Sequence, residues 1–296
     1  MFLSSSDCKA WFAVFLIESV TIVTVNLLSI ILFIKNSNLR SRGMYLIINL
    51  TVADVLVGGI STFQLLKMVH FYCNIVTLNL TEEGNVVTNF CFYFFPLTSL
   101  SNIAVISLER LHATFRPFRH RVIKKRVYWV TISAIWVSAA VVSTAIIIIT
   151  IFSPNKWRLY YFALWQSYSC LCLFVICVCY TCISIQFLCG ARPPHHGAAN
   201  RQRKLTVTLL LMTVISLIMW LPYALGSFIN LTTNTFRYIS FQDKVRWSLS
   251  MITLFNANSL VNPLLYAIRM PAFKRALFAL FKQRRDAVVP PHPCYM

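Results

Sequence analysis

Polar side chains that could do chemistry lie inside an otherwise apolar run at residues 246–268. Each amide or hydroxyl there is unfavourable in hydrocarbon, so it must face other protein or a water-filled cavity. A proline in the same run removes a backbone donor and bends a helix. The run therefore predicts a kinked helix with a hydrated polar face, formed by Asn258, Ser259, Asn262 and Pro263.

A carboxylate, Asp54, lies in the middle of a second apolar run at residues 44–68. Ionisation there requires a counter-charge or strong hydrogen-bond donors, so an intramembrane acid is a candidate functional residue. We expect Asp54 to face the interior of a bundle. The alternative is a protonated Asp54 with a structural role only.

No pattern in the chain predicts catalysis. An intramembrane enzyme would need a nucleophile with its base or a set of metal ligands, and neither His-Glu-x-x-His nor Gly-x-Ser-x-Gly occurs in the sequence. The cysteines of the fifth apolar run also lack a spacing that suits a metal. We therefore expect the protein not to be an enzyme.

Membrane-spanning helices must position these residues. Of the 296 residues, 58% are hydrophobic and 12% are charged, and the mean hydropathy is +0.68, which lies far outside the soluble globular range. Apolar windows of about 20 residues or more predict spans. They lie near 11–34, 44–68, 87–110, 128–152, 159–188, 205–230 and 246–268. No repeat or linker divides the chain, so we predict an all-α membrane protein with one domain over residues 1–296.

The basic residues predict how the chain is oriented. The net charge is +19, and most of the 27 Lys and Arg follow the first, third and fifth spans or lie in the C-terminal tail. By the positive-inside rule these segments are cytoplasmic and the N-terminus is extracellular. The charge reflects topology and attraction to anionic membrane lipids, and no nucleic acid is expected as a partner. On the predicted outer side, Asn79 and Asn230 begin N-glycosylation sequons.

Motifs on separate predicted spans occur in the order of one receptor family. They are Asn26, Asp54, Arg110, Trp136, Trp220-x-Pro222 and Asn262-Pro263-x-x-Tyr266. With Phe273 seven residues after the tyrosine, the chain resembles the rhodopsin-like (class A) G protein-coupled receptors. The resemblance implies a seven-transmembrane helix bundle with a short amphipathic eighth helix near 271–282. It also implies a plasma-membrane location, an extracellular ligand and a heterotrimeric G protein as partner.

The same resemblance implies a role for the intramembrane polar residues. In the family, their counterparts surround a water cluster that can hold a sodium ion. We expect such a polar core here, formed by Asp54, Ser99, Asn258, Ser259 and Asn262. Sodium would be an allosteric ion at Asp54, and no other cofactor is expected. Asn26 is expected to form a structural hydrogen bond to the second or seventh helix.

A second group of residues matches the family's coupling and activation machinery. It comprises Glu109, Arg110, Pro117, Phe118, Tyr180, Pro222, Pro263 and Tyr266. The resemblance implies that Pro117-Phe118 contacts the G protein and that both tyrosines join Arg110 in an active-state polar contact. The alternative for the Glu109-Arg110 pair is a solvated ion pair. The family's acid on the sixth helix is replaced by Gln202, which predicts raised basal signalling.

The ligand class is narrowed by exclusion. Phe92 stands where amine receptors carry aspartate, and Asn256 stands where opsins carry the retinal-binding lysine. The remaining candidate pocket is formed by Phe92, Tyr93, Trp220, Tyr223, Phe255 and Asn256. Its apolar walls predict a small neutral or lipid-like ligand, and Lys67 and Arg246 near the mouth would suit an anionic head. The alternative is that these aromatic residues only pack the bundle.

The chain departs from the family pattern at its outer face. The usual disulfide between the third helix and the second extracellular loop is absent, which leaves Cys8, Cys73 and Cys91 as possible partners. The fifth span has Cys172 in place of a proline, and the loop at 153–158 is short. These departures resemble the branch that contains melanocortin, cannabinoid and lysophospholipid receptors.

A seven-helix transporter or channel is the competing functional class. Such a protein would also bury Asp54 and Asn262. Transporters, however, tend to show repeated halves with paired broken helices, and the sequence has neither. The receptor is therefore the preferred interpretation.

Overall fold

The computed structural model describes residues 3–36, 43–73, 81–152, 157–189, 207, 211, 214–226, 228–229, 239–269 and 273–280. Its long helices are α1 (Ser5–Lys35), α2 (Met44–Met68), α3 (Glu82–Phe115), α5 (Lys125–Phe152), α6 (Trp157–Cys189) and α8 (Phe241–Arg269). A π-helical turn, η2 (Val69–Cys73), continues α2, and the short helix α4 (Pro117–Arg121) follows α3. Further helical segments cover Val214–Gly226 and residues 273–280.

Six helices in these ranges are long and apolar enough to cross a membrane. They coincide with six of the predicted spans, and Val214–Gly226 falls inside the remaining one, 205–230. Several helices begin before the predicted apolar window, because their first turns carry capping and charged residues outside the hydrocarbon. The helical segment 273–280 lies within the predicted interfacial helix.

The first turns of α1 and α3 show why these helices begin where they do. Ser4 Oγ accepts a hydrogen bond from the Asp7 amide at 3.1 Å. Thr81 Oγ1 accepts from the Gly84 amide, also at 3.1 Å. Asp7 and Glu82 lie in the first turns, where a negative charge is stabilised by the helix dipole. Each helix start is therefore specified locally.

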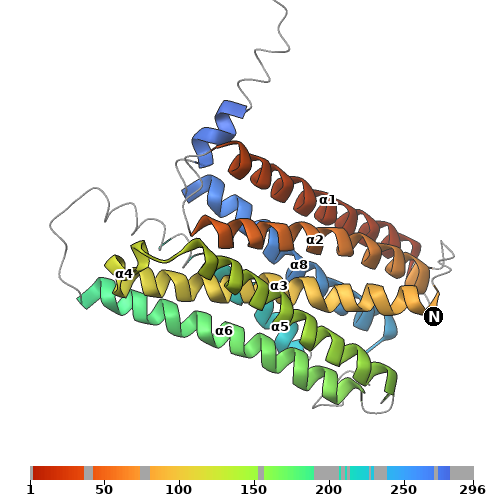
Figure 1. The fold of residues 1–296 in the computed structure, drawn as a ribbon. Helices are drawn as coiled ribbons and strands as arrows, with labels where there is room; N and C mark the ends of the chain where they lie inside the picture. The colour runs from red at the N-terminus through yellow and green to blue at the C-terminus, as the bar shows by residue number, and fades with distance from the viewer. Residues whose placement is uncertain are drawn as a thin grey trace, which may run out of the picture.

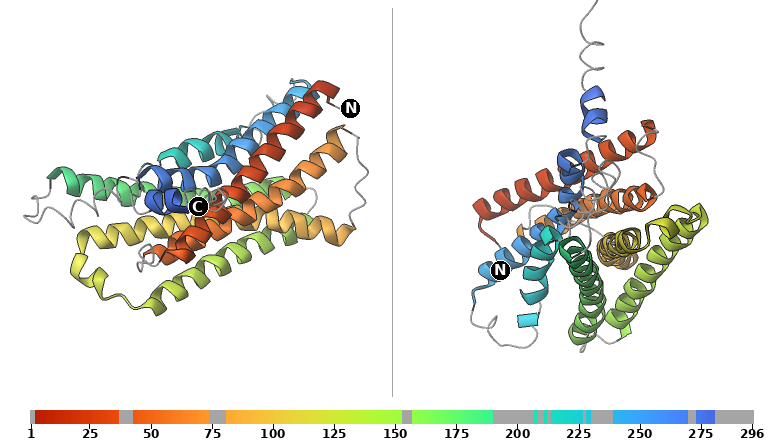
Figure 2. Two further views of the ribbon diagram at one scale, coloured as in Figure 1. Left: turned by 90° about the horizontal axis from the view of Figure 1, so that it is seen from above. Right: turned by 90° about the vertical axis from the view of Figure 1, so that its left-hand side faces the viewer.

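The long helices lie side by side, tilted relative to one another (Figures 1 and 2), and α3 contacts α2, α5 and α6. On the other side, α1 contacts α2 and α8. Large apolar side chains remain exposed on the outside of the bundle, among them Ile17, Val141 and Phe174, at 67%, 63% and 65%. In an apolar helix such a surface suits contact with lipid.

The largest buried apolar cluster among the described residues joins α1, α2, α3, α5, α6 and α8. Its members include Leu50, Leu97, Leu100, Ile146, Ile176 and Tyr266. Pro96 and Pro263 are buried inside α3 and α8. This cluster holds the helices together around their buried polar residues.

Candidate functional site

The intramembrane polar residues of α2, α3 and α8 converge on Asp54, which is fully buried. Ser99 Oγ donates to Asp54 Oδ1 at 2.7 Å, and Ser259 Oγ donates to the same oxygen at 2.8 Å. Asn262 Nδ2 donates to Asp54 Oδ2 at 2.7 Å. Three neutral donors from two other helices thus compensate the carboxylate. The structure brings together four of the five residues predicted for the polar core.

The fifth predicted residue, Asn258, is also buried, and it has no hydrogen bond to Asp54 among the described residues. Its Oδ1, and the Oδ1 atoms of Asn26 and Asn262, are buried and have no hydrogen-bond partner within the described ranges. Asn26 Nδ2 donates to the Ser259 carbonyl at 3.0 Å, which is a contact to the seventh predicted span. Carboxylate, hydroxyl and amide oxygens are ligands that hard cations prefer. The oxygen atoms of these side chains are therefore suitable ligands for a sodium ion.

A second polar network, which the sequence analysis missed, joins α2, α3 and α5. Asn49 Nδ2 donates to Asn102 Oδ1 at 2.7 Å, and Trp136 Nε1 donates to Asn49 Oδ1 at 3.0 Å. Trp136 therefore has a specific partner beyond packing. The available signal was an asparagine in each of two apolar spans, because such an amide needs a partner in hydrocarbon.

The predicted pocket aromatics form one connected cluster. Trp220 and Phe255 lie edge to face at 4.5 Å between ring centroids, and Tyr223 lies 5.3 Å from Phe255. Tyr93 connects to them through Trp165, at 5.4 Å, and Trp165 lies 6.2 Å from Phe255. In this conformation the aromatic side chains pack against one another.

Three details of this cluster differ from the expectation. Trp165 of α6, which is 1% exposed, lies at its centre and was missed, although a tryptophan in an apolar span is a detectable signal. Phe92 lies at the edge, in contact with Tyr93 at 5.2 Å. Asn256 is directed to α2, where its Nδ2 donates to Gln64 Oε1 at 3.4 Å.

The C-terminal end of α3 carries the charged pair Glu109–Arg110. The two side chains form an ion pair, each 9% exposed, so the pair is largely buried and not solvated. His120 Nε2 lies 2.6 Å from Glu109 Oε1, and the Tyr128 hydroxyl donates to the same oxygen at 3.5 Å. Gly43 lies so close that an added Cβ would be 3.0 Å from Glu109 Oε1. Both His120 and Tyr128 were missed.

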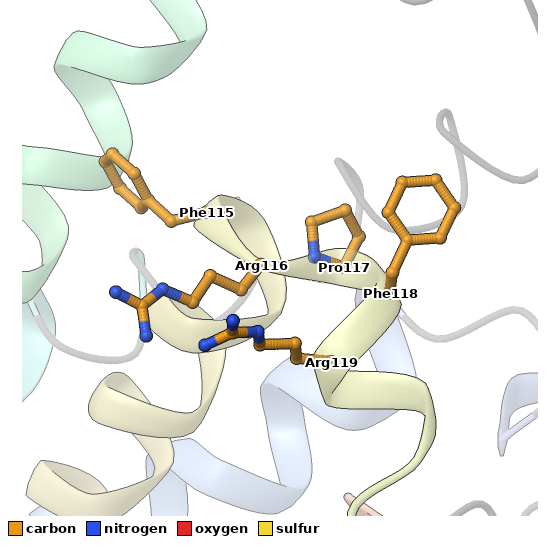
Figure 3. Close-up of a pocket in the computed structure, with 5 residues that line it drawn as sticks. All are labelled: Phe115, Arg116, Pro117, Phe118 and Arg119. Carbon is orange, nitrogen blue, oxygen red and sulfur yellow. The ribbon is translucent and has the colours of Figure 1, made fainter.

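The turn between α3 and α4 forms a pocket lined by Phe115, Arg116, Pro117, Phe118 and Arg119. Figure 3 shows both arginine side chains extended to one side of the turn, while the Phe118 ring points away from them. Phe118 is 82% exposed. An exposed aromatic ring and arginine side chains on the same turn together form a surface suited to a protein partner.

Comparison with known protein families identifies the family of this chain. The family model described as "7 transmembrane receptor (rhodopsin family)" matches residues 25–266. The chain belongs to the rhodopsin family of seven-transmembrane receptors. It is 24% identical to human melanocortin receptor 3 over 281 residues, which cover 90% of this receptor and 84% of the relative. It is 26% identical to Opsin-VA of Rutilus rutilus over 276 residues, covering 86% and 69%.

The fold agrees with this assignment. Squid rhodopsin superposes with a TM-score of 0.72 at 16% identity, covering 98% of this receptor and 89% of the rhodopsin chain. The predictions of a class A receptor, of a seven-helix bundle and of a protein that is not an enzyme are confirmed. The receptor is a multi-pass membrane protein. Its relatives include both a melanocortin receptor and an opsin at similar identity, so the comparisons do not separate one branch.

The end of the receptor that is predicted to be the outer one is held by a disulfide between Cys8 of α1 and Cys73 of η2, with Cα atoms 5.9 Å apart. Cys91 is a free, half-buried thiol. The sequence left all three as candidates. The π-helical turn brings Cys73 beside the first turns of α1, and this placement selects the pair.

The cations near the predicted pocket mouth have protein partners. Arg246 Nη2 lies 2.8 Å from Asp7 Oδ2, and Arg246 Nη1 lies 3.1 Å from Asp243 Oδ1. Lys67 Nζ donates to Asn89 Oδ1 at 3.0 Å. These contacts weaken the case for an anionic head group on the ligand.

The remaining predicted positions divide into placed and undescribed residues. The Tyr266 ring packs on Phe33 and Phe273, at centroid distances of 5.9 and 6.0 Å, and among described residues no hydrogen bond joins it to Arg110. Tyr180 is buried on α6, and Pro222 is half-buried in Val214–Gly226. Asn79, Asn230 and Gln202 lie outside the described residues.

Proposed function

We propose that this receptor binds a small, lipid-like or neutral extracellular ligand within its bundle and activates a heterotrimeric G protein. One observation carries the proposal: the single helix α3 contributes to the aromatic cluster, the polar core and the buried ion pair. Tyr93, Ser99 and Arg110 are its contributions. From Tyr93 to Arg110 the helix rises about 26 Å, so a shift of α3 in the pocket would move the charged end.

The ligand class follows from what lines the aromatic cluster. The cluster presents ring faces and edges from α3, α6, α8 and Val214–Gly226, which favour an apolar body. One polar group is available there, since the buried Trp220 Nε1 has no hydrogen-bond partner among the described residues. A ligand that carries one acceptor could use it. Entry would require Trp220 and Phe255 to separate.

The buried Arg110–Glu109 pair is the proposed switch to the G protein. In this conformation Arg110 is 8% exposed and paired to its neighbour. Activation would release the guanidinium toward Tyr180 and Tyr266, while Phe118 would insert into the G protein. Pro222 and Pro263 would supply the bends about which the helices move. The N-terminus would be extracellular, and the receptor would act at the plasma membrane with glycans at Asn79 and Asn230.

Sodium is proposed as a negative allosteric ion at Asp54. The ion would be held by the Asp54 carboxylate with oxygens of Ser99, Asn258 and Asn262, and it would favour the conformation in which these residues converge. Asp54→Asn should remove the effect of sodium on agonist affinity. If wild-type affinity is as insensitive to sodium as that of Asp54→Asn, the polar core does not bind the ion.

The receptor proposal is tested by nucleotide exchange on a panel of purified G proteins with the receptor in nanodiscs. Lipid extracts serve as the agonist source, and ion flux is measured in liposomes. We expect exchange on at least one G protein, abolished by Arg110→Ala. Arg126→Ala, an exposed arginine of α5, is the matched control and should retain activity. Flux without exchange would favour the transporter or channel.

A further inference from the structure

One intramembrane acid has no role in the sites described above. Glu18 lies in α1 and is 7% exposed. Neither of its carboxylate oxygens has a hydrogen-bond partner among the described residues. Asp54, the comparable acid of α2, accepts three hydrogen bonds. A structural acid would be expected to have such partners, because an unpaired polar group in hydrocarbon is strongly unfavourable.

The register between α1 and α8 places another unpaired oxygen at the depth of Glu18. Asn26 donates to the Ser259 carbonyl, which aligns the two helices. Glu18 lies eight residues before Asn26, about 12 Å along α1, and Thr253 lies six residues before Ser259, about 9 Å along α8. Thr253 Oγ1 is buried and has no hydrogen-bond partner within the described ranges.

Apolar layers enclose this level from both sides. Toward the polar core, Gly58 of α2 packs so closely on α1 that an added Cβ would lie 2.8 Å from Ile22 Cγ2. Toward the outer end, Phe15, Leu65 and Leu249 belong to one buried cluster from α1, α2 and α8. The unpaired oxygens therefore lie between apolar layers that α1, α2 and α8 contribute, and an electrostatic contact is strong in such surroundings.

We infer that Glu18 and Thr253 form a binding site for a primary ammonium group between α1, α2 and α8. Three acceptor atoms have no hydrogen-bond partner among the described residues, namely Glu18 Oε1, Glu18 Oε2 and Thr253 Oγ1, and they match the three N–H donors of such a group. The group's positive charge compensates the carboxylate at the same time. The site is distinct from the Asp54 core and does not depend on the proposed coupling to a G protein.

The proposal also fits the charges at the outer end. Lys67 and Arg246, the cations near the predicted pocket mouth, already contact Asn89, Asp7 and Asp243. The unpaired acid is inside the bundle instead. An amphiphilic amine, with an apolar chain among the helices and its ammonium at Glu18, is the ligand class that the structure favours here.

The test uses the full chain in phosphatidylcholine nanodiscs, because phosphatidylcholine has no N–H donor. Hexylamine and hexanol are titrated at pH 7, where the amine is protonated since its pKa lies near that of lysine, about 10. The midpoint of thermal unfolding is measured. Hexylamine should raise the midpoint saturably, and hexanol should not. Equal effects of the two compounds would overturn the proposal.

Two variants locate the site. Glu18→Gln should raise the half-maximal hexylamine concentration by about tenfold or more, because a charge-assisted contact is lost. Glu83→Gln, the same change at an exposed glutamate of α3, should leave it unchanged. An undiminished response of Glu18→Gln refutes the assignment. Glu18→Gln should fold, since it removes an ionisable group from an apolar environment.

A third variant and a second probe test the hydrogen-bond donors. Hexyltrimethylammonium has the charge but no N–H, so it should bind more weakly than hexylamine. Thr253→Val should weaken the binding of hexylamine several-fold and leave the binding of hexyltrimethylammonium unchanged. Equal potency of the two cations contradicts the three-donor site. Stabilisation by sodium chloride that depends on Glu18, without an effect of hexylamine, would show an inorganic cation site and also overturn the proposal.

Discussion

Two adjacent glycines in α2 differ completely in their surroundings. A Cβ added to Gly58 would lie 2.8 Å from Cγ2 of Ile22 and of Val23 in α1. A Cβ added to Gly59 would meet no atom of the described residues within 4 Å. Gly58→Ala and Gly59→Ala therefore make the same chemical change, and only the first creates a clash. The pair measures how closely α1 and α2 must approach.

The magnitude follows from contact distances. Carbon atoms pack best at about 3.5–4.0 Å, so α1 and α2 would have to separate by about 1 Å to admit the methyl group of Gly58→Ala. Overpacking of this kind typically destabilises by about 1–3 kcal/mol. Replacing glycine by alanine inside a helix contributes about 1 kcal/mol of the opposite sign. That gain applies to both variants. The destabilisation caused by the clash therefore equals the difference in the free energy of unfolding between Gly59→Ala and Gly58→Ala.

The assay is thermal unfolding of the purified receptor in nanodiscs of one lipid composition. Gly59→Ala should be at least as stable as the wild type, and Gly58→Ala should unfold several degrees below Gly59→Ala. If Gly58→Ala is as stable as Gly59→Ala, the close crossing of α1 and α2 is wrong. The apolar layer between Glu18 and the polar core would then be absent as well.

Three further outcomes follow. Gln202→Glu should lower agonist-free nucleotide exchange several-fold, because the added acid can pair with Arg110 of α3. Unchanged basal exchange at matched expression would contradict this. Cys8→Ser and Cys73→Ser should each destabilise by about 2–4 kcal/mol, and the double variant by no more than either single one. Trp136→Phe should lower the free energy of unfolding by about 1 kcal/mol. Its effect should not add to that of Asn49→Leu in the double variant.

The sequence by itself determined the helices and their membrane setting. Hydrocarbon permits only helices or closed barrels as spanning elements, and a run of about 20 apolar residues leaves little choice of length or position. The same reasoning singled out Asp54, Asn258 and Asn262, since polar groups in such runs must turn inward. These inferences use only neighbouring residues and the solvent, so they need no knowledge of packing.

Tertiary structure alone decided which residues meet across helices. Cys73 rather than Cys91 pairs with Cys8 because η2 carries it to α1. His120 reaches Glu109 because α4 folds back on α3, and Trp165 centres the aromatic cluster through the packing of α6. Glu18 was visible in the sequence as a polar residue. That its oxygens lack partners in the part of the chain that the structure describes depends on every side chain packed around it. Such contacts are set by how whole helix faces fit together, and that fit has no local signature in the chain.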